Sequence, residues 1–265
     1  MRQKNSSWEG SQLIKLKGPE LLEKYRRAGR AVAGCLSLLE NIVKEGTSRT
    51  LLEMDKLAEE FIRDNECTPT FLGYKGFPNS VCISLNRELV HTIPNNRTLR
   101  DGDIITFDLG ATFQEAIGDA ALTTIFGEPK SSEHIRLIKA TQEALSKAII
   151  SIKEGARLGV IGNAISKCAQ QYGLSVVTQY GGHGIELNQP HAFPFVSNKD
   201  NPNNGVRFAP GMVIAIEPLF VIGQSNKTTT LDDKWTVICD NICSHHESTI
   251  YIHDDYHVEI LTERK

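Results

Sequence analysis

The chain has 265 residues, of which 40% are hydrophobic and 23% are charged, and its formal net charge is −3 at pH 7. This length allows one large domain or two small ones with a sizeable core. The slightly acidic balance lacks the basic footprint of a nucleic-acid-binding protein, so we expect no sequence-specific nucleic-acid partner.

The N-terminus predicts neither export nor membrane anchoring. Residues 1–12 are polar and typical of a loose tail, without the apolar centre of a signal peptide. The sequence has no apolar run of membrane-spanning length. Six cysteines are scattered along the chain, which is typical of free thiols in a reducing compartment. We therefore expect a cytoplasmic protein that makes no membrane contact.

Helical and extended patterns follow one another along the chain and favour an α+β class, with antiparallel strands covered by helices. In chain order they predict a helix from Pro19 until Gly46, a second from Leu51 to Asp64, strands at Thr68–Phe71, Ser80–Leu85 and Glu88–His91, a hairpin between Asp103 and Phe126, helices at Ser131–Ile152 and Val160–Tyr172, and then strands and loops to Leu261.

The predicted hairpin carries two acids in apolar surroundings. A chain reversal near Phe113-Gln114 would place Asp108 directly opposite Asp119 on the paired strands. Facing like charges are destabilising, and in a half-buried place one of them would have to stay protonated. A divalent cation bound by both carboxylates removes the conflict. The alternative is one exposed aspartate and one turn aspartate, and these residues alone leave both open.

An internal repeat with one constant spacing predicts two related halves. The turn Val43–Gly46 resembles Ile152–Gly155, and Asp101-Gly102 before a strand resembles Pro210-Gly211 before another. At the same spacing, Asp108 ends one apolar strand and Glu217 ends the other. If the halves pack about a pseudo-twofold axis, these two acids meet at its centre.

Further along the chain, three more residues extend this pair of aspartates to a set of possible ligands. His183 lies among glycines, where the backbone can approach a ligand closely, Glu217 ends a strand, and Glu247 begins one. Four carboxylates and one imidazole suit two closely spaced divalent ions with a bridging water. The set is rich in oxygen, so Mn, Fe or Co fits as well as Zn.

Each of these residues also has an ordinary structural interpretation. A single histidine such as His91 or His191 is more often structural than catalytic, and Glu217-Pro218 resembles a common strand end. The run Cys239-x-x-x-Cys243-x-His245-His246 resembles a zinc motif. No second cysteine pair lies near it in the sequence, so we do not favour a zinc site there.

The sequence resembles the methionine aminopeptidases of the short type (type 1), in metallopeptidase family M24, from about Ile14 to Lys265. The residues that carry the resemblance are Gly73–Ser84, Asn86, His91–Pro94, Gly102–Asp108, Gly118-Asp119, Gly182–Ile185, Gly211–Pro218 and Glu247. It implies the pita-bread fold, with two pseudo-symmetric halves at about 20–127 and 131–262 around an antiparallel β-sheet. On this basis residues 13–265 form one catalytic domain after the tail 1–12.

The resemblance also implies a site with two divalent metal ions, which could be Co, Mn, Fe or Zn. The implied ligands are Asp108 on one ion, Asp119 and Glu247 bridging both, and His183 and Glu217 on the other. A bridging water would be the nucleophile, with Glu217 as proton acceptor. His91 would hydrogen-bond the scissile amide, and His191 would hold the carbonyl oxygen as charge develops.

The same resemblance predicts an apolar pocket for the substrate side chain. Its implied residues are Phe71, Tyr74, Phe77, Cys82 and Trp235. Phe71 departs from the small residue usual in the family, and Pro190 stands before His191 where an aromatic is common. A bulky Phe71 could narrow the pocket or replace the missing aromatic wall, and the sequence leaves both open.

The function implied is removal of the initiator methionine from nascent proteins when the second residue is small, with action at the ribosome as one setting and a monomer as the expected form. Two alternatives remain. An Xaa-Pro aminopeptidase or dipeptidase of the same fold usually carries an extra N-terminal domain, and only the short tail 1–12 precedes the match here. A non-catalytic pita-bread peptide-binding protein typically loses ligands, whereas all five are present.

Overall fold

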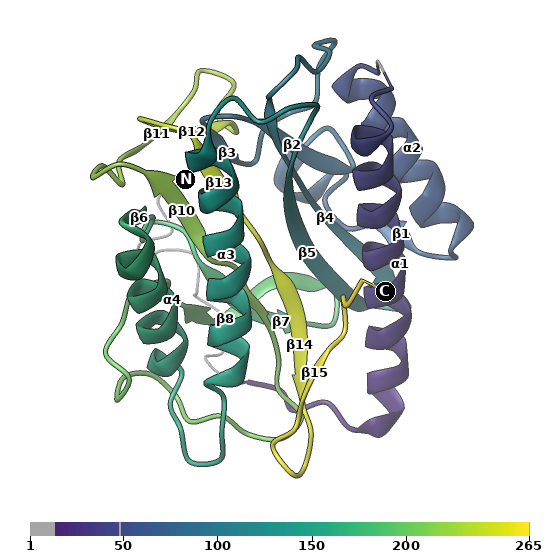
Figure 1. Ribbon diagram of the computed structural model, residues 1–265. Coiled ribbons are helices and arrows are strands. Elements are labelled where there is room, and N and C mark those ends of the chain that lie inside the picture. Colours follow the sequence, from purple (N-terminus) through teal and green to yellow (C-terminus); the bar gives the residue numbers. More distant parts are fainter. Residues whose placement is uncertain (1–13, 48, 265) are drawn as a thin grey trace.

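The computed structural model describes residues 14–47 and 49–264 (Figure 1). In chain order its elements are α1 (Pro19–Lys44), α2 (Leu51–Asp64), β1 (Thr68–Pro69), the 3₁₀ helix η1 (Tyr74–Gly76), β2 (Val81–Leu85), β3 (Glu88–Val90), β4 (Ile104–Phe113), β5 (Ala116–Ile125), α3 (Ser132–Ile150), α4 (Gly159–Tyr172), β6 (Leu174–Val176), β7 (Gly182–Glu186), β8 (Gln189–Val196), β9 (Val213–Ile216), β10 (Leu219–Ile222), β11 (Thr228–Thr230), β12 (Val237–Cys239), β13 (Cys243–His245), β14 (Ser248–Ile252) and β15 (Val258–Ile260). All four predicted helices are present, so the periodicity argument is confirmed.

The helices among these described residues lack the length and apolarity needed to cross a membrane. The predicted tail, residues 1–12, lies outside the described residues.

The strands of the described chain form four antiparallel sheets. β1, β2 and β5 pair with β4 in one sheet, and a five-stranded sheet has the order β15-β14-β9-β7-β8. Two three-stranded sheets, β13-β10-β6 and β11-β12-β3, complete the set. α1 and α2 cover the outside of the β4 sheet, whereas α3 and α4 pack against each other over the second half of the chain (Figure 1). The strands therefore lie between two helical layers.

The helix α2 is fixed at both its start and its middle by side chains that accept backbone hydrogen bonds. Thr50 and Glu53 form a reciprocal capping box, which satisfies two donors of the first turn. The buried Asp55 carboxylate accepts the N–H groups of Ser80 and Val81, each at 2.9 Å. Because β2 begins at Val81, this contact positions the segment that leads into the cavity described below.

The hairpin β4–β5 has a different register from the one predicted. Asp119 pairs with Gly110 and Asp108 pairs with Ala121, so the two aspartates are diagonal neighbours and do not face each other directly. The turn residues are Gln114 and Glu115, both with positive φ, at 45° and 73°. The predicted register is wrong by two residues, and a shift of two keeps both carboxylates on the same face of the sheet.

A neighbouring loop stabilises this glycine-free turn. The backbone N–H of Asn188, between β7 and β8, donates to the Glu115 carbonyl at 2.8 Å, and its side-chain amide donates to the Glu115 carboxylate at 2.7 Å. Such tertiary contacts compensate for a turn conformation that asparagine or glycine would adopt more readily. The tertiary structure therefore sets the register, and the local sequence does not.

The internal repeat is visible in the positions of the elements. β4 begins at Ile104 and β9 at Val213, and both are central strands of their sheets. Gly102 and Gly211, two residues before these strands, both have positive φ, at 77° and 85°. In both halves of the α+β fold, a glycine with positive φ thus precedes the central strand by two residues, as the internal repeat predicted.

The helix α1 lies unusually close to β5 at a contact between two glycines. A Cβ added at Gly118 would lie 2.8 Å from the Cα of Gly29, and one added at Gly29 would lie 2.2 Å from the carbonyl oxygen of Leu261. Both positions are therefore restricted to glycine by space. Gly118 directly precedes Asp119, so this contact holds the strand that carries one of the predicted ligands.

We expect Gly29→Ala to lower the free energy of unfolding by about 1–3 kcal/mol, because the new methyl group overlaps backbone atoms that cannot move independently. Gly34→Ala in the same helix is the matched control, since its Cβ meets only the ring tip of Phe61 at 2.8 Å. There the gain in helix propensity of about 1 kcal/mol offsets the crowding. Urea denaturation of both variants measures the difference, and equal stabilities would contradict the close-contact argument.

Candidate active site

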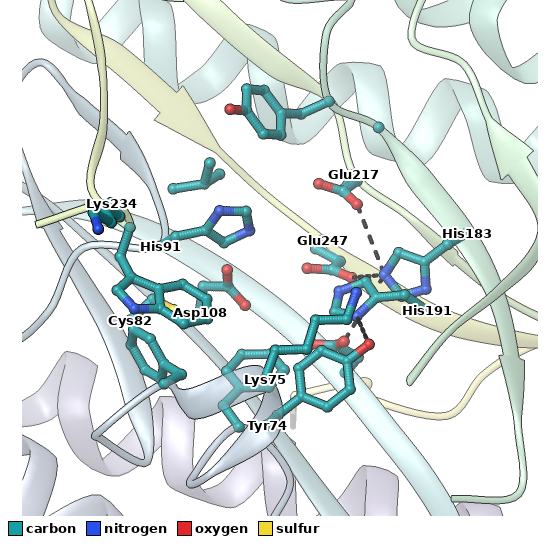
Figure 2. A pocket seen from close by; sticks show the side chains of 17 residues that line it. Tyr74, Lys75, Cys82, His91, Asp108, His183, His191, Glu217, Lys234 and Glu247 are labelled. Carbon is teal, nitrogen blue, oxygen red and sulfur yellow. Dashed lines mark hydrogen bonds and ion pairs between the residues drawn. The ribbon is translucent and has the colours of Figure 1, made fainter. Parts of the chain in front are cut away.

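A cavity of about 520 Å³ opens between the two halves, and every site residue predicted from the sequence lines it (Figure 2). Those residues are Phe71, Tyr74, Phe77, Cys82, His91, Asp108, Asp119, His183, His191, Glu217, Trp235 and Glu247. Pro190, by contrast, is not among the described residues that line it. The fold therefore brings together side chains that are far apart in the sequence.

Hydrogen bonds between β5 and the start of β14 join two of the acids. The Asp119 N–H donates to the Thr249 hydroxyl at 2.8 Å, and the same hydroxyl donates to the Asp119 carbonyl at 2.7 Å. The Glu247 N–H donates to the Ala121 carbonyl at 3.0 Å. These contacts, which we call the β5–β14 seam, hold Asp119 and Glu247 side by side at the centre of the cavity.

The remaining ligand candidates are positioned by the five-stranded sheet and by β4. His183 on β7 pairs with Ala215 on β9, and Glu217 follows β9 directly. The side-chain amide of Asn198 donates to the Glu217 carbonyl at 2.9 Å, which fixes the backbone where the strand ends. Asp108 lies in the middle of β4, and burial leaves all four carboxylates with little solvent contact.

The distances around His183 match the needs of a shared cation. Its Nε2 lies 3.9 Å from Asp119 Oδ2, 3.8 Å from Glu217 Oε1 and 3.9 Å from Glu247 Oε1. These are too long for hydrogen bonds. They are shorter than about 4.2 Å, the largest separation of two atoms that bind one first-row metal at typical bond lengths. A cation between these atoms would satisfy all of them.

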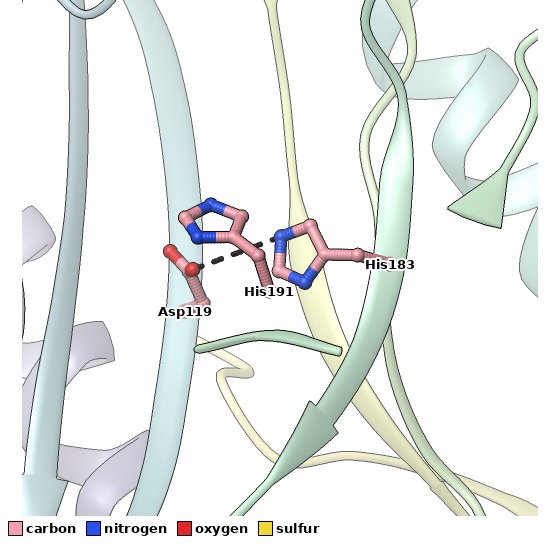
Figure 3. A group of neighbouring side chains, drawn as sticks. All are labelled: Asp119, His183 and His191. Atoms are coloured by element: carbon pink, nitrogen blue, oxygen red, sulfur yellow. Dashed lines mark ion pairs between the residues drawn. The ribbon is translucent and has the colours of Figure 1, made fainter. Parts of the chain in front are cut away.

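Three groups of possible ligand atoms overlap at this point, with all atoms of a group within 4.8 Å of one another. One contains Asp108, Asp119 and Glu247, a second contains His183, Glu217 and Glu247, and a third contains Asp119, His183 and His191 (Figure 3). Glu247 is shared by the first two groups. Asp119 is shared by the first and third, so the arrangement offers adjacent positions for a cation with Asp119 and Glu247 between them.

Buried oxygen atoms without partners support the same interpretation. Asp119 Oδ1 and Glu247 Oε1 are buried and have no hydrogen-bond partner in the described part of the chain. A buried charged oxygen that remains unsatisfied is costly, whereas coordination to a metal removes the penalty. The residues present thus fit a divalent cation.

Without a cation, the four carboxyl groups cannot all be ionised. Burial raises the pKa of Asp108 to about 7. Burial, together with the neighbouring carboxylates, raises the pKa values of Asp119, Glu217 and Glu247 well above their usual range. Groups that are protonated would therefore have to release their protons when a cation binds, and the cation would balance the carboxylate charges.

The tautomer of His183 is suited to metal binding. Its Nδ1 lies 3.2 Å from the Gly184 carbonyl, and a carbonyl oxygen can only accept, so Nδ1 carries the proton. Burial lowers the pKa of the ring to about 4, which keeps it neutral at pH 7. Nε2 then presents a lone pair to the carboxylate oxygens, as expected of a ligand oriented by a backbone carbonyl.

His91 and His191 stand on either side of the cavity as neutral imidazoles (Figure 2). Burial lowers the pKa of His91 to about 4 and holds the pKa of His191 well below its usual value. His191 Nδ1 lies 3.2 Å from the Tyr74 hydroxyl, and the His91 ring packs edge-on against Tyr180. Neutral rings can donate a hydrogen bond to a bound amide or carbonyl without adding charge.

One end of the cavity is apolar. Phe71, Phe77 and Cys82 form a buried cluster, with Ile93 and Trp235 packed against it. The Phe77 and Trp235 rings meet edge to face, with centroids 5.2 Å apart. Phe71 is therefore part of this wall, and the cluster can receive an uncharged side chain next to the acidic centre.

Sequence reasoning missed one histidine of the site. His245 Nε2 lies 3.6 Å from Glu217 Oε2 and 3.5 Å from Glu247 Oε2. The sequence placed it only within a zinc-like motif, yet the Cys243 thiol contacts the carbonyls of Asn86 and Glu88 at 3.3 Å. Cys243 therefore faces backbone carbonyls, whereas His245 faces the two glutamates. The spacing of two between His245 and Glu247 is the signal that could have placed it on the same face.

The lysines at the cavity were also not predicted. Lys75 and Lys234 line it, and both side chains are exposed (Figure 2). Their backbones have positive φ, at 49° and 65°. Nothing in the local sequence distinguished them from other surface lysines.

Comparisons with known proteins agree with this site. Residues 23–259 match the model of metallopeptidase family M24. The chain is 40% identical over 253 residues to a methionine aminopeptidase of Mycoplasma capricolum, which covers 95% of this chain and 99% of that protein. It is 41% identical over 242 residues to methionine aminopeptidase 1 of Bacillus subtilis, which covers 91% and 96%.

Solved structures show the same similarity. A methionine aminopeptidase from Thermotoga maritima matches with a TM-score of 0.89 and 34% identity, over 95% of this chain and all of that one (100%). A prolidase from Pyrococcus furiosus matches with a TM-score of 0.73 and 20% identity, over 94% of this chain and 66% of that one. The second likeness concerns the fold alone.

The raised pKa of Asp108 predicts a pH dependence in the metal-free protein. A carboxyl group whose pKa is higher in the folded protein than in the unfolded chain stabilises the fold most at low pH. This stabilisation is lost as the pH rises from about 4 to 7. The stability of Asp108→Asn relative to the parent chain should therefore rise by up to about 4 kcal/mol between about pH 4 and pH 7. Above about pH 7 the difference should stay constant.

Urea denaturation in the presence of a chelator, from pH 4.5 to 8, measures this effect. Asp64→Asn is the control, because Asp64 is exposed at the end of α2. A stability difference between Asp108→Asn and the parent that is the same at every pH would show that the buried carboxyl does not titrate in this range.

Proposed function

The chain belongs to metallopeptidase family M24, and we propose that it is a metal-dependent aminopeptidase that removes the N-terminal methionine from proteins whose second residue is small. Its α+β architecture is the pita-bread fold. The observation that carries the proposal is the cavity in which all five predicted ligands adjoin a buried apolar wall. This combination suits hydrolysis of a peptide bond next to an apolar first side chain.

The residues that would hold the metal are Asp108, Asp119, His183, Glu217 and Glu247. We propose two ions, because two of the ligand groups overlap in Glu247. When bound, such ions lower the pKa of water and stabilise negative charge on a carbonyl oxygen. Their identity, among Co, Mn, Fe and Zn, is for metal analysis to decide.

The chain's own side chains would orient the substrate and move protons. Glu217 is buried next to two histidine rings, so its carboxylate can accept a proton and return it to the leaving amine. His91 can donate to the scissile amide. His191, held by the Tyr74 hydroxyl, can donate to the carbonyl oxygen as charge develops there.

The apolar wall supports methionine as the first residue. Phe71 is buried within it and packs with Phe77 and Cys82, which favours the interpretation that Phe71 supplies an aromatic wall. Burial also raises the pKa of the Cys82 thiol well above its usual value, so Cys82 acts as an apolar surface. The pocket thus takes an uncharged, flexible side chain.

The setting of the enzyme is also part of the proposal. We place residues 13–265 in one catalytic domain that acts as a monomer in the cytoplasm on nascent chains, at the ribosome or shortly after. All six cysteines are free and buried, which fits a reducing compartment.

The proposal predicts cleavage of Met-Ala-Ser in the presence of Mn or Co, and no cleavage after chelation. Glu247→Gln should lower kcat/KM by at least about 100-fold, because it replaces the carboxylate shared by both ligand groups with an amide. The fold should remain, as circular dichroism can verify. Peptide hydrolysis followed by chromatography measures the loss.

Assays with an Xaa-Pro peptide distinguish this proposal from an Xaa-Pro peptidase of the same fold. Cleavage of only the proline substrate would identify an Xaa-Pro peptidase, and no cleavage with any metal would favour a peptide-binding protein. Retention of most activity in Glu247→Gln would contradict the assignment of the metal ligands.

His91→Ala should lower kcat by about 10²–10⁴-fold, because the variant loses a hydrogen-bond donor to the reacting amide. Metal affinity should change by less than about threefold, since no ligand group in the described chain includes His91. Calorimetric titration with Mn measures the affinity. His257→Ala is the control, because His257 is an exposed histidine. A large loss of bound metal in His91→Ala would refute the proposed role of His91.

A further inference from the structure

His245 lies behind the two glutamates of the metal centre, on the side opposite His183. Glu217 and Glu247 each direct Oε1 toward His183 Nε2 and Oε2 toward His245 Nε2. The two imidazoles therefore hold the pair of carboxylates between them. His245 itself is 1% exposed, so solvent does not compete for this contact.

Strand geometry explains why these three side chains converge. His245 pairs with Leu219 across β10 and β13, and Glu217 and Glu247 each lie two residues from that pair. In extended backbone, residues two apart project to the same face. The neighbouring His246 is buried too, but adjacent residues in extended backbone project to opposite faces, and the described chain has no ion pair between His246 and either glutamate.

The backbone of His245 is held tightly. The Thr123 hydroxyl on β5 donates to the His245 carbonyl at 2.7 Å and accepts the His245 N–H at 2.9 Å. The Thr106 hydroxyl lies 2.8 Å from the same hydroxyl and completes its hydrogen bonding. The imidazole thus approaches the glutamates from a fixed position against the first half's sheet, next to the β5–β14 seam.

Both nitrogens of this ring lack a hydrogen-bond partner in the part of the chain that the structure describes. A buried imidazole without any partner is costly, and the carboxylate oxygens are the polar atoms it faces. A shift of a few tenths of an ångström would bring either Oε2 into hydrogen-bond range.

We propose that His245 is a positioning residue of the metal centre: its Nε2–H donates to the Oε2 edge of Glu217 and Glu247 and fixes both carboxylates with Oε1 toward His183. This inference rests on the proposed metal centre and adds a residue to its outer shell. Donors of this kind orient ligands and are worth about 10–100-fold in metal affinity.

The geometry favours a donor over a further ligand. The three groups of mutually close ligand atoms found in the described chain include His183 and His191, and His245 belongs to none of them. Its Nε2 faces the far oxygens of the glutamates, away from the atoms that face His183. A donor role also predicts that an amide can replace the ring, whereas a ligand role does not.

The proposal is tested by calorimetric titration of the full-length chain with Mn after a chelator has removed bound metal. His245→Ala should weaken Mn binding by about 10–100-fold, and His245→Gln should stay within about threefold of the parent, because the glutamine amide can supply a donor near the position of Nε2. His246→Ala is the matched control, as an adjacent histidine of similar burial, and should bind Mn as the parent does.

Three outcomes would overturn the proposal. Unchanged affinity in His245→Ala would show that the ring has no role, and equal losses in the Ala and Gln variants would show that a nitrogen ligand has been removed. Equal losses in His245→Ala and His246→Ala would indicate a general effect on the fold. A parent chain that binds no Mn would refute the metal centre itself, which separates that failure from the failure of the role of His245.

Discussion

The Thr249 hydroxyl, which donates to the Asp119 carbonyl and accepts the Asp119 N–H, is the interaction on which the site depends. It joins strands from the two halves of the chain at the point where their acids meet. The N–H of Thr249 itself donates to the Thr262 hydroxyl at 3.1 Å, so the last described segment of the chain braces the same point. A single buried hydroxyl thus bridges the two larger sheets, and Asp119 and Glu247 become neighbours as a consequence.

This seam brings Asp119 and Glu247 together, beside Asp108 and Glu217, at an energetic cost. Their pKa values are raised because burial and mutual repulsion disfavour ionisation. The rest of the fold holds them with contacts that cannot yield, such as the Gly29–Gly118 approach of α1 to β5. Rigid surroundings keep the carboxyl groups from moving apart, so without a cation some of them must stay protonated. The same preorganisation that destabilises the metal-free protein favours metal binding.

Much of this arrangement follows from the sequence, and its failures have physical causes. Helical periodicity located the helices, and the constant spacing of the repeat anticipated that Asp108 and Glu217 occupy equivalent strand positions. The hairpin register was wrong because Asn188, distant in sequence, supports the turn at Gln114-Glu115. His245 was not assigned to the site, because the pairing of β13 with β10 that brings it to Glu217 is a long-range contact. The aromatic residues of the cavity were found only by resemblance, because the residue patterns by themselves did not single them out.

The repeat also explains why the two candidate metal positions differ. The strand residues Asp108 and Glu217 are equivalent within the repeat, but the residues added around them are not. The first half contributes Asp119, so the group of Asp108, Asp119 and Glu247 consists of oxygen atoms alone. The second half contributes His183, which places a nitrogen beside Glu217. Because imidazole favours borderline metals and carboxylates favour harder ones, the two ends of the proposed metal centre would differ chemically, with Asp119 and Glu247 between them.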